Sequence, residues 1–270
     1  MDGFEKPVLR VKHLRKQFGN GCEYCRDLEN NKLEKNYCPK CGTVYACQDI
    51  SFEVYKGEVL GVVGESGSGK STMMQSLYFD KDVTSGEVYL EKYKNGEVNV
   101  LEESDQQKRY IRNNLLGKVY QNPMLGLKMS FSSIGNIAER LIAARNRNVS
   151  KMTARAKELL EDVNIPLYRM KEEPANFSGG MQQRVQIAKA LSTKPPILLL
   201  DEVTTGLDLS VQANVLDLIK KLQRENNISM VVVSHDLGVI RMLCDRTLVM
   251  LNAKVVEEGL TDQILQDPQH

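Results

Sequence analysis

The chain contains a glycine-rich segment whose residue types and spacing can hold a polyphosphate. Residues 64–71 are Gly-Glu-Ser-Gly-Ser-Gly-Lys-Ser and match the pattern G-x-x-x-x-G-K-[ST] in full. The glycines let the backbone curl around an anion, and the start of the following helix adds a partial positive charge. We expect Lys70 to reach the β- and γ-phosphates of a nucleotide and Ser71 to bind Mg²⁺. The predicted phosphate-binding residues are Gly64, Gly67, Ser68, Gly69, Lys70, Ser71 and Thr72.

Two carboxylates follow an apolar run that predicts a buried strand over Ile197–Leu200. Acids are not tolerated in the middle of such a strand, but its carboxyl end faces the ligand crevice in α/β sheets. We expect Asp201 to hold Mg²⁺, directly or through water. Glu202 is placed to orient or deprotonate an attacking water.

Four of the six cysteines have metal-ligand spacing: Cys22-x₂-Cys25, then twelve residues, then Cys38-x₂-Cys41. Two such turns can complete a tetrahedral four-thiolate site, with Zn²⁺ as a structural ion and iron as the alternative. Residues 19–46 form an insertion too small to build its own core, so the metal would hold it folded. We expect it to be a docking element for a partner.

Length and composition place these motifs in a globular chain. The 270 residues correspond to one large domain or two small ones, with 41% hydrophobic and 26% charged residues. Lysine plus arginine is 36 and aspartate plus glutamate is 35, and the resulting net charge of +1 gives no support for a nucleic-acid partner. The apolar runs are strand-sized, so we expect a cytoplasmic protein that can still dock onto a membrane protein.

The pattern of apolar runs predicts an α/β fold. Strands are expected over Val8–Leu14, Ile50–Val54 and Val59–Val63, and a β segment over Gly86–Val100 is expected to turn as a hairpin at Asn95-Gly96. Residues 105–194 are predicted to be mostly helical. From Ile197 onward, strands alternate with amphipathic helices, which indicates βαβ units and a mainly parallel sheet.

Residues 177–184, Phe-Ser-Gly-Gly-Met-Gln-Gln-Arg, predict a helix start that Ser178 can cap. Together with Leu-Leu-Leu-Asp-Glu at 198–202, this segment resembles the signature and Walker B elements of ATP-binding cassette (ABC) ATPases. The order of motifs is similar to that family across nearly the whole chain. The resemblance implies one ABC ATPase domain over 1–270. It would have a P-loop NTPase core with a mainly parallel sheet, an antiparallel β subdomain and a helical subdomain at 105–194.

The resemblance also implies roles for single residues. Gln121 matches the Q-loop glutamine that contacts Mg²⁺ and senses the γ-phosphate, and Asp208 lies in the D-loop. His235 matches the switch histidine, and Phe18 matches the aromatic residue that stacks on adenine. The implied catalytic residues are Lys70, Gln121, Glu202 and His235.

In this family, residues matching Ser178, Gly179 and Gly180 of one chain close over the ATP held by Lys70 of another. The resemblance therefore implies a second cassette subunit, and we expect a homodimer. Val203 stands where the family usually has proline, and we expect this departure to leave activity intact.

A finer resemblance concerns residues 121–141, from Gln121 to Leu141. They are similar to the ATP-binding K subunits of bacterial carbon–phosphorus lyase systems in their Gly-Leu pair, their run of small residues and Gly-Asn-Ile-x-Glu-Arg-Leu. This implies soluble lyase core subunits as partners in phosphonate catabolism. Those subunits continue with a short tail, so we expect a shortened chain end after His270.

Two other functions stay open. The same phrases recur more loosely in the ATPases of dipeptide and oligopeptide importers, whose partners are integral membrane permease subunits. Those proteins usually have Thr-Ser-Leu-Asn-Pro after the Q-loop, and this chain does not. A cassette protein acting on DNA or ribosomes is the least supported, because such proteins often have two cassettes or a long coiled coil.

Overall fold

The computed structural model describes residues 6–26 and 33–269, and two sheets organise them. The smaller sheet is antiparallel, with the order β2-β1-β4; its strands are β1 (Leu9–Phe18), β2 (Val44–Val54) and β4 (Ser85–Leu90). The larger sheet has the order β5-β6-β7-β3-β8-β9, and only its β8–β9 pair is antiparallel. Its strands are β3 (Val59–Gly64), β5 (Leu116–Val119), β6 (Ile197–Asp201), β7 (Ser229–Val233), β8 (Arg246–Leu251) and β9 (Lys254–Leu260). The predicted fold class is confirmed.

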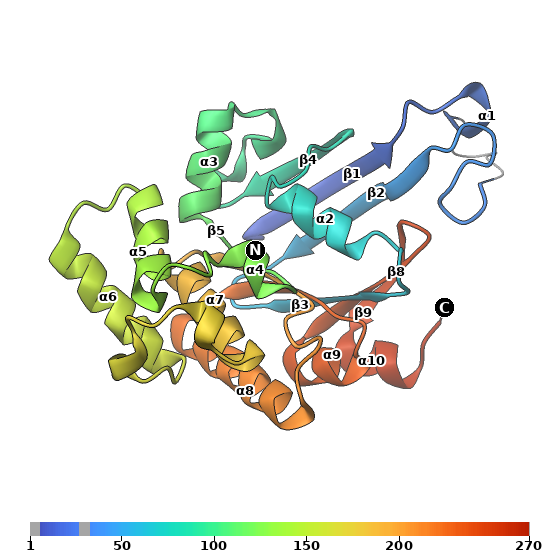
Figure 1. Ribbon diagram of the computed structural model, residues 1–270. Helices are drawn as coiled ribbons and strands as arrows, with labels where there is room; N and C mark the ends of the chain where they lie inside the picture. The colour runs from blue at the N-terminus through green and yellow to red at the C-terminus, as the bar shows by residue number, and fades with distance from the viewer. Residues whose placement is uncertain (1–5, 27–32, 270) are drawn as a thin grey trace, which may run out of the picture.

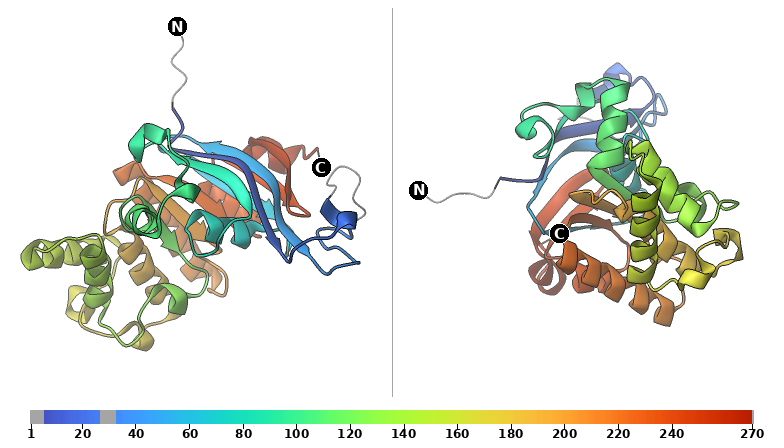
Figure 2. Two further views of the ribbon diagram at one scale, coloured as in Figure 1. Left: turned by 90° about the horizontal axis from the view of Figure 1, so that it is seen from above. Right: turned by 90° about the vertical axis from the view of Figure 1, so that its left-hand side faces the viewer.

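Helices cover the larger sheet and form a separate helical layer around α5 and α6 (Figures 1 and 2). The helices are α1 (Glu23–Arg26), α2 (Lys70–Leu77), α3 (Asp105–Asn114), α4 (Pro123–Gly126), α5 (Ser133–Ala143), α6 (Val149–Asp162), α7 (Gly179–Leu191), α8 (Leu209–Asn226), α9 (Leu237–Leu243) and α10 (Thr261–Gln266). Within residues 6–26 and 33–269, no helix combines the length and the apolar character that a membrane span requires.

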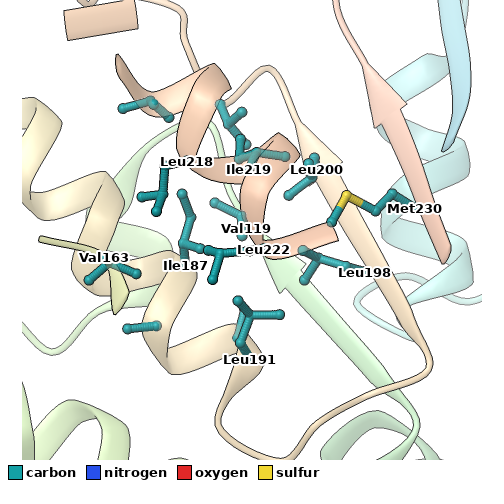
Figure 3. Close-up of a cluster of buried hydrophobic side chains, with 14 of the residues drawn as sticks. Val119, Val163, Ile187, Leu191, Leu198, Leu200, Leu218, Ile219, Leu222 and Met230 are labelled. Carbon is teal, nitrogen blue, oxygen red and sulfur yellow. The ribbon is translucent and has the colours of Figure 1, made fainter. Parts of the chain in front are cut away.

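Strand β6 explains how the core divides. Successive side chains of a strand point to opposite faces. Leu198 and Leu200 therefore join the cluster beneath α7 and α8, where they lie near Ile187 and Leu222 (Figure 3). Leu199, with the opposite direction, joins the cluster shared with α2 and the small sheet. A strand buried on both faces has no polar side until its carboxyl end, where Asp201 and Glu202 follow.

The predicted hairpin at Asn95-Gly96 is wrong. Lys94, Asn95 and Gly96 all have positive φ (45°, 57° and 68°), and this segment is a 3-10 turn, followed by a second over Val100–Glu102. The Asn99 side chain accepts hydrogen bonds from the N–H groups of Val88 and Leu101 and so ties the turns back to β4. A tertiary contact of this side chain thus replaces the second strand.

Two predicted ranges also differ in detail. Residues 105–194 contain strand β5, which pairs with β6 in the larger sheet and was too short to stand out in a helical region. Strand β1 ends at Phe18 and β2 begins at Val44, so residues 44–46 of the predicted insertion belong to β2. The described part of the insertion, residues 19–26 and 33–43, lies at the far ends of β1 and β2, away from α5 and α6 (Figure 1).

Candidate nucleotide site and cysteine cluster

The glycine-rich segment forms the loop between β3 and α2, at the carboxyl end of the parallel sheet. Gly69 has φ +101°, and a Cβ placed there would lie 1.9 Å from the Ala46 carbonyl oxygen on β2. No larger residue fits between this loop and the small sheet. The loop is therefore packed against β2 immediately before α2 begins.

The Lys70 ammonium lies inside the loop. Its Nζ donates to the carbonyl oxygens of Gly64 at 2.7 Å and Glu65 at 2.9 Å, and the residue is 5% exposed. Burial lowers the pKa of Lys70, while the nearby carboxylates of Glu202 and Asp201 raise it. A cation held this way, with its charge only partly balanced, favours binding of an anion.

Ser71 and Asp201 come together from α2 and β6. The Ser71 hydroxyl donates to Asp201 Oδ1 at 3.3 Å. Burial raises the pKa of Asp201, whereas the Lys118 ammonium and this hydrogen bond lower it. Hydroxyl and carboxylate oxygens are the ligands that Mg²⁺ prefers, so this pair can hold the ion.

Glu202 and His235 meet because β6 and β7 are adjacent and parallel. Asp201 pairs in register with Val233, so both strands end at the same edge. His235 Nδ1 lies 3.3 Å from Glu202 Oε1, and the Thr205 hydroxyl donates to Glu202 Oε2 at 3.3 Å. A carboxylate oriented from two sides can position a water molecule and accept its proton.

The remaining predicted site residues lie on exposed parts of the molecule. Gln121 is exposed between β5 and α4. Ser178 caps α7, its hydroxyl accepting from the Met181 N–H at 3.4 Å, and Gly179 beside it is exposed while Gly180 is buried. Three further predicted residues lie elsewhere: Thr72 in the first turn of α2, Asp208 exposed before α8, and Phe18 at the end of β1.

Phe18 is 42% exposed, with the Lys16 and Lys81 ammonium groups each 5.1 Å from its ring centroid. An exposed ring between two cations can stack on a base and leave both cations near phosphates.

Two buried glutamines of α7 were not singled out in the sequence. Gln186 Nε2 donates to the Tyr120 carbonyl at 3.1 Å, and its Oε1 accepts from the Tyr120 N–H at 2.6 Å. Gln183 Nε2 donates to the Val203 carbonyl at 3.0 Å. They connect the signature helix to the chain before Gln121 and to the chain after Glu202. In the sequence, these two glutamines could have been found because they lie on the face of the predicted helix that is otherwise apolar.

The four cysteines Cys22, Cys25, Cys38 and Cys41 form one cluster, with all Sγ atoms within 4.8 Å of one another. Three Sγ–Sγ distances are 3.7, 3.9 and 3.6 Å. A tetrahedral ion with metal–sulfur bonds of about 2.3 Å has an edge of about 3.8 Å, whereas a disulfide has about 2.05 Å. The cluster therefore fits a metal ion and not a disulfide pair.

Thr43 and Tyr45 support this cluster from the start of β2. The Thr43 hydroxyl accepts from the Gly21 N–H at 3.0 Å, and the Thr43 carbonyl accepts from the Cys38 N–H at 2.9 Å. Hydrogen bonds with Thr43 lower the pKa of Cys41 to about 6, which favours the thiolate that binds metals. The Tyr45 hydroxyl donates to the Cys25 carbonyl at 2.8 Å.

Comparison with known proteins identifies this arrangement. Residues 47–205 match the ABC transporter family, and this match covers more than half of the chain. The chain belongs to the ABC ATPase family. It is an ATPase, and membership of this family implies that it uses ATP and Mg²⁺.

Individual relatives show which members of the family this chain resembles. The chain is 46% identical over 243 residues to the Escherichia coli K12 protein named "Putative phosphonates utilization ATP-binding protein PhnK", covering 90% of this chain and 93% of that one. It is 39% identical over 253 residues to the dipeptide transport ATP-binding protein DppD of Bacillus subtilis, covering 90% and 73%.

Among solved structures, the chain is similar to the ATP-binding cassette MJ0796 in a dimeric post-hydrolysis state bound to ADP and Pi. The TM-score is 0.76 at 29% identity, and the match covers 94% of this chain and 98% of that chain. A cassette of this family thus assembles with a second cassette.

The Gln186 contacts predict a measurable loss of stability. In Gln186→Ala, the Tyr120 N–H loses its partner and the Tyr120 carbonyl keeps only the longer hydrogen bond from Gln183 at 3.4 Å, and we expect the free energy of unfolding to fall by about 1–3 kcal/mol. Urea denaturation measures this. The matched control is Gln106→Ala on the exposed face of α3, expected within about 0.5 kcal/mol of the parent chain. Equal losses in both variants would contradict the proposed link.

Proposed function

We propose that this chain is the ATP-binding subunit associated with a soluble carbon–phosphorus lyase core in phosphonate catabolism. The observation that carries the proposal is the 46% identity to PhnK along nearly the full length of both chains, against 39% to DppD over 73% of that protein. The similarity of residues 121–141 to such subunits supports it further. The chain would couple ATP turnover to the lyase core and would not itself break the carbon–phosphorus bond.

We propose the following division of labour in the nucleotide site. The loop Gly64–Ser71 binds the triphosphate, and Lys70 exchanges its two carbonyl partners for phosphate oxygens. Ser71, Asp201 and Gln121 hold Mg²⁺, which supplies positive charge to the transferred phosphoryl group. Glu202 orients and deprotonates the attacking water. His235, which follows β7, would hold Glu202 in place and contact the γ-phosphate.

The signature residues act on a nucleotide held by a second chain. Ser178 and Gly179 are exposed at the start of a 13-residue helix, α7, whose N–H groups and dipole favour phosphate. Asp208 is exposed just before α8, and the residue before it, Leu207, lies beside Gly179 at the start of α7. The dimeric form of MJ0796 supports a two-chain sandwich, and we propose a homodimer.

A surface beside the Q-loop offers a place for the partner. A cavity of about 240 Å³ is lined by residues that include Tyr120, Leu125, Glu139 and Arg140. Leu125 in the lining is 71% exposed, and the preceding residue, Met124, is 65% exposed. Adjacent apolar side chains beside a charged hollow are typical of a protein-binding surface. Gln121 precedes them, so a partner there can sense the nucleotide site.

We propose Zn²⁺ as the ion of the cysteine cluster. Four thiolates with tetrahedral spacing, the only ligand type in the cluster among residues 6–26 and 33–269, are typical of structural zinc. Metal-bound thiols of this type fit a reducing compartment, and we propose the cytoplasm as the place where the protein acts. Iron remains the second candidate, since paired cysteines also serve rubredoxin-type centres.

The second candidate function is the motor of a peptide importer. Its support is the 39% identity to DppD over 90% of this chain. An importer motor would use the same nucleotide site and would dock on integral membrane permease subunits. The two proposals therefore differ only in the partner.

Replacing Glu202 separates binding from hydrolysis. In Glu202→Gln we expect ATP hydrolysis to fall by about 10²–10⁴-fold, because the amide cannot accept a proton from water. Binding is retained, since Lys70 and the loop are unchanged. Phosphate release and size-exclusion chromatography with ATP and Mg²⁺ measure both, and the variant should elute as a dimer. Glu225→Gln, on the exposed side of α8, is the matched control. Full activity in Glu202→Gln would overturn the assignment.

Affinity purification from native cytoplasm and membranes tests the partner. We expect tagged Glu202→Gln chain, held closed by ATP, to recover the soluble lyase subunits, and Leu125→Asp to lose them while it still binds ATP. Leu237→Asp, 53% exposed on α9, serves as the control. Recovery of integral membrane permease subunits would overturn the first proposal and establish the second.

Metal analysis tests the zinc proposal. We expect about one zinc per chain, reduced strongly in Cys38→Ser because three ligands cannot close the site. Cys47→Ser, in β2 outside the cluster, keeps the zinc. Plasma mass spectrometry of the purified chains gives the metal content. A chain purified with iron, or with no metal, would show the proposal to be wrong.

A further inference from the structure

The cysteine insertion touches the phosphate loop directly. Asn36 Nδ2 donates to the Gly67 carbonyl oxygen at 3.4 Å, across 31 residues of sequence. Asn36 lies two residues before Cys38, inside the insertion at the ends of β1 and β2 (Figure 1). The insertion therefore reaches the element that binds ATP.

Asn36 is itself held by the insertion. Its carbonyl accepts from the Tyr45 N–H at 2.8 Å. It occupies a tight turn closed by two backbone hydrogen bonds between Glu34 and Tyr37, at 3.0 and 3.1 Å. The turn leads straight into Cys38, which is buried in the cysteine cluster. The position of the Asn36 amide thus depends on the fold of the cluster.

A second contact between the cysteine cluster and the phosphate loop runs through the start of β2. Tyr45 packs in the small core that also contains Cys25 and Cys38. The next residue, Ala46, presents its carbonyl oxygen to Gly69, where a Cβ would come within 1.9 Å. The insertion and its supporting strand therefore contact the loop at two glycines.

Fewer neighbouring atoms constrain the backbone at Gly67 than at Gly69. It has φ +82°, and a Cβ placed on it would meet nothing within 4 Å, so this side of the loop is open. A peptide unit is planar and trans, so its carbonyl and N–H point in opposite directions. Fixing the Gly67 carbonyl outward also fixes the Ser68 N–H, which donates back across the loop to the Glu65 carbonyl at 3.1 Å.

We propose that Asn36 is a positioning residue for the phosphate loop and that the metal-bound insertion thereby sets the affinity for ATP. This rests on the proposed metal site. The described insertion buries only Cys25, Cys38 and Thr43, and Tyr45 of β2 packs against the two cysteines. Without metal the four thiols are no longer bonded to a common centre, and we expect a segment with so small a core to unfold. Asn36 then leaves Gly67, and ATP binding must also order the loop.

Titration with a fluorescent ATP analogue and Mg²⁺ tests the coupling. We expect metal removal by a strong chelator to weaken ATP binding by about three- to tenfold, because one hydrogen bond to the loop is lost and the loop must be ordered on binding. Added zinc should restore the affinity. Asn36→Ala should bind with the weakened affinity while retaining its zinc. Metal removal should then change its affinity no further, because the connecting residue is already lost. Its KM for ATP should rise more than its kcat falls.

Glu34→Gln is the matched control, since that side chain is exposed in the same turn. It should keep the full response to metal. Metal removal without any change in affinity, in a chain that circular dichroism shows to be folded, would overturn the coupling. A metal effect that persists in Asn36→Ala would exclude Asn36 as the connection. A chain that binds no metal would instead refute the metal proposal, so the two failures are distinguishable.

Discussion

The site depends on one geometric constraint: the carboxyl ends of adjacent parallel strands meet at one edge of a sheet. The order β6-β7-β3 places three strand ends side by side. The loop with Lys70 follows β3, Asp201 and Glu202 end β6, and His235 follows β7. Ser71 and Asp201, 130 positions apart in the chain, are thereby brought within hydrogen-bonding distance. Strands β5 and β8 flank this set, and β5 contributes the Lys118 ammonium, which lowers the pKa of Asp201.

The charges at this edge are arranged to favour an anion with its cation. Burial lowers the pKa of Lys70 and raises that of Asp201, so each group is less stable as an ion than it would be in water. In each case, neighbouring groups of the opposite charge shift the pKa in the other direction. Lys118, with a fully buried side chain paired to Asp80 at 2.8 Å, contributes to this balance from β5. A triphosphate and Mg²⁺ would complete the pairing of charges that the protein leaves partial.

The insertion differs from the rest of the fold in how little apolar surface it buries. The two large cores are apolar and close-packed, whereas the insertion has almost no apolar interior and relies on four convergent thiols. Its only described links to the phosphate loop are polar and short, through Asn36 and through β2 beside Gly69. A cysteine cluster with metal-binding spacing thus lies in a segment that contacts the phosphate loop.

Local patterns determined much of this protein in advance. The phosphate loop, the strand with Asp201 and Glu202, and the paired cysteines each lie within a few residues, so their spacing predicted a chemistry for each. The alternation of strands and helices after Ile197 predicted the α/β class, which the structure confirms. Tertiary structure decided the rest. Asn99 accepts from the Val88 N–H where a hairpin was predicted, Gln186 reaches Tyr120 across 66 residues, and Asn36 reaches Gly67 across 31. Such contacts join side chains to distant backbone groups, and no local spacing encodes them, because the partner is chosen by how the elements pack.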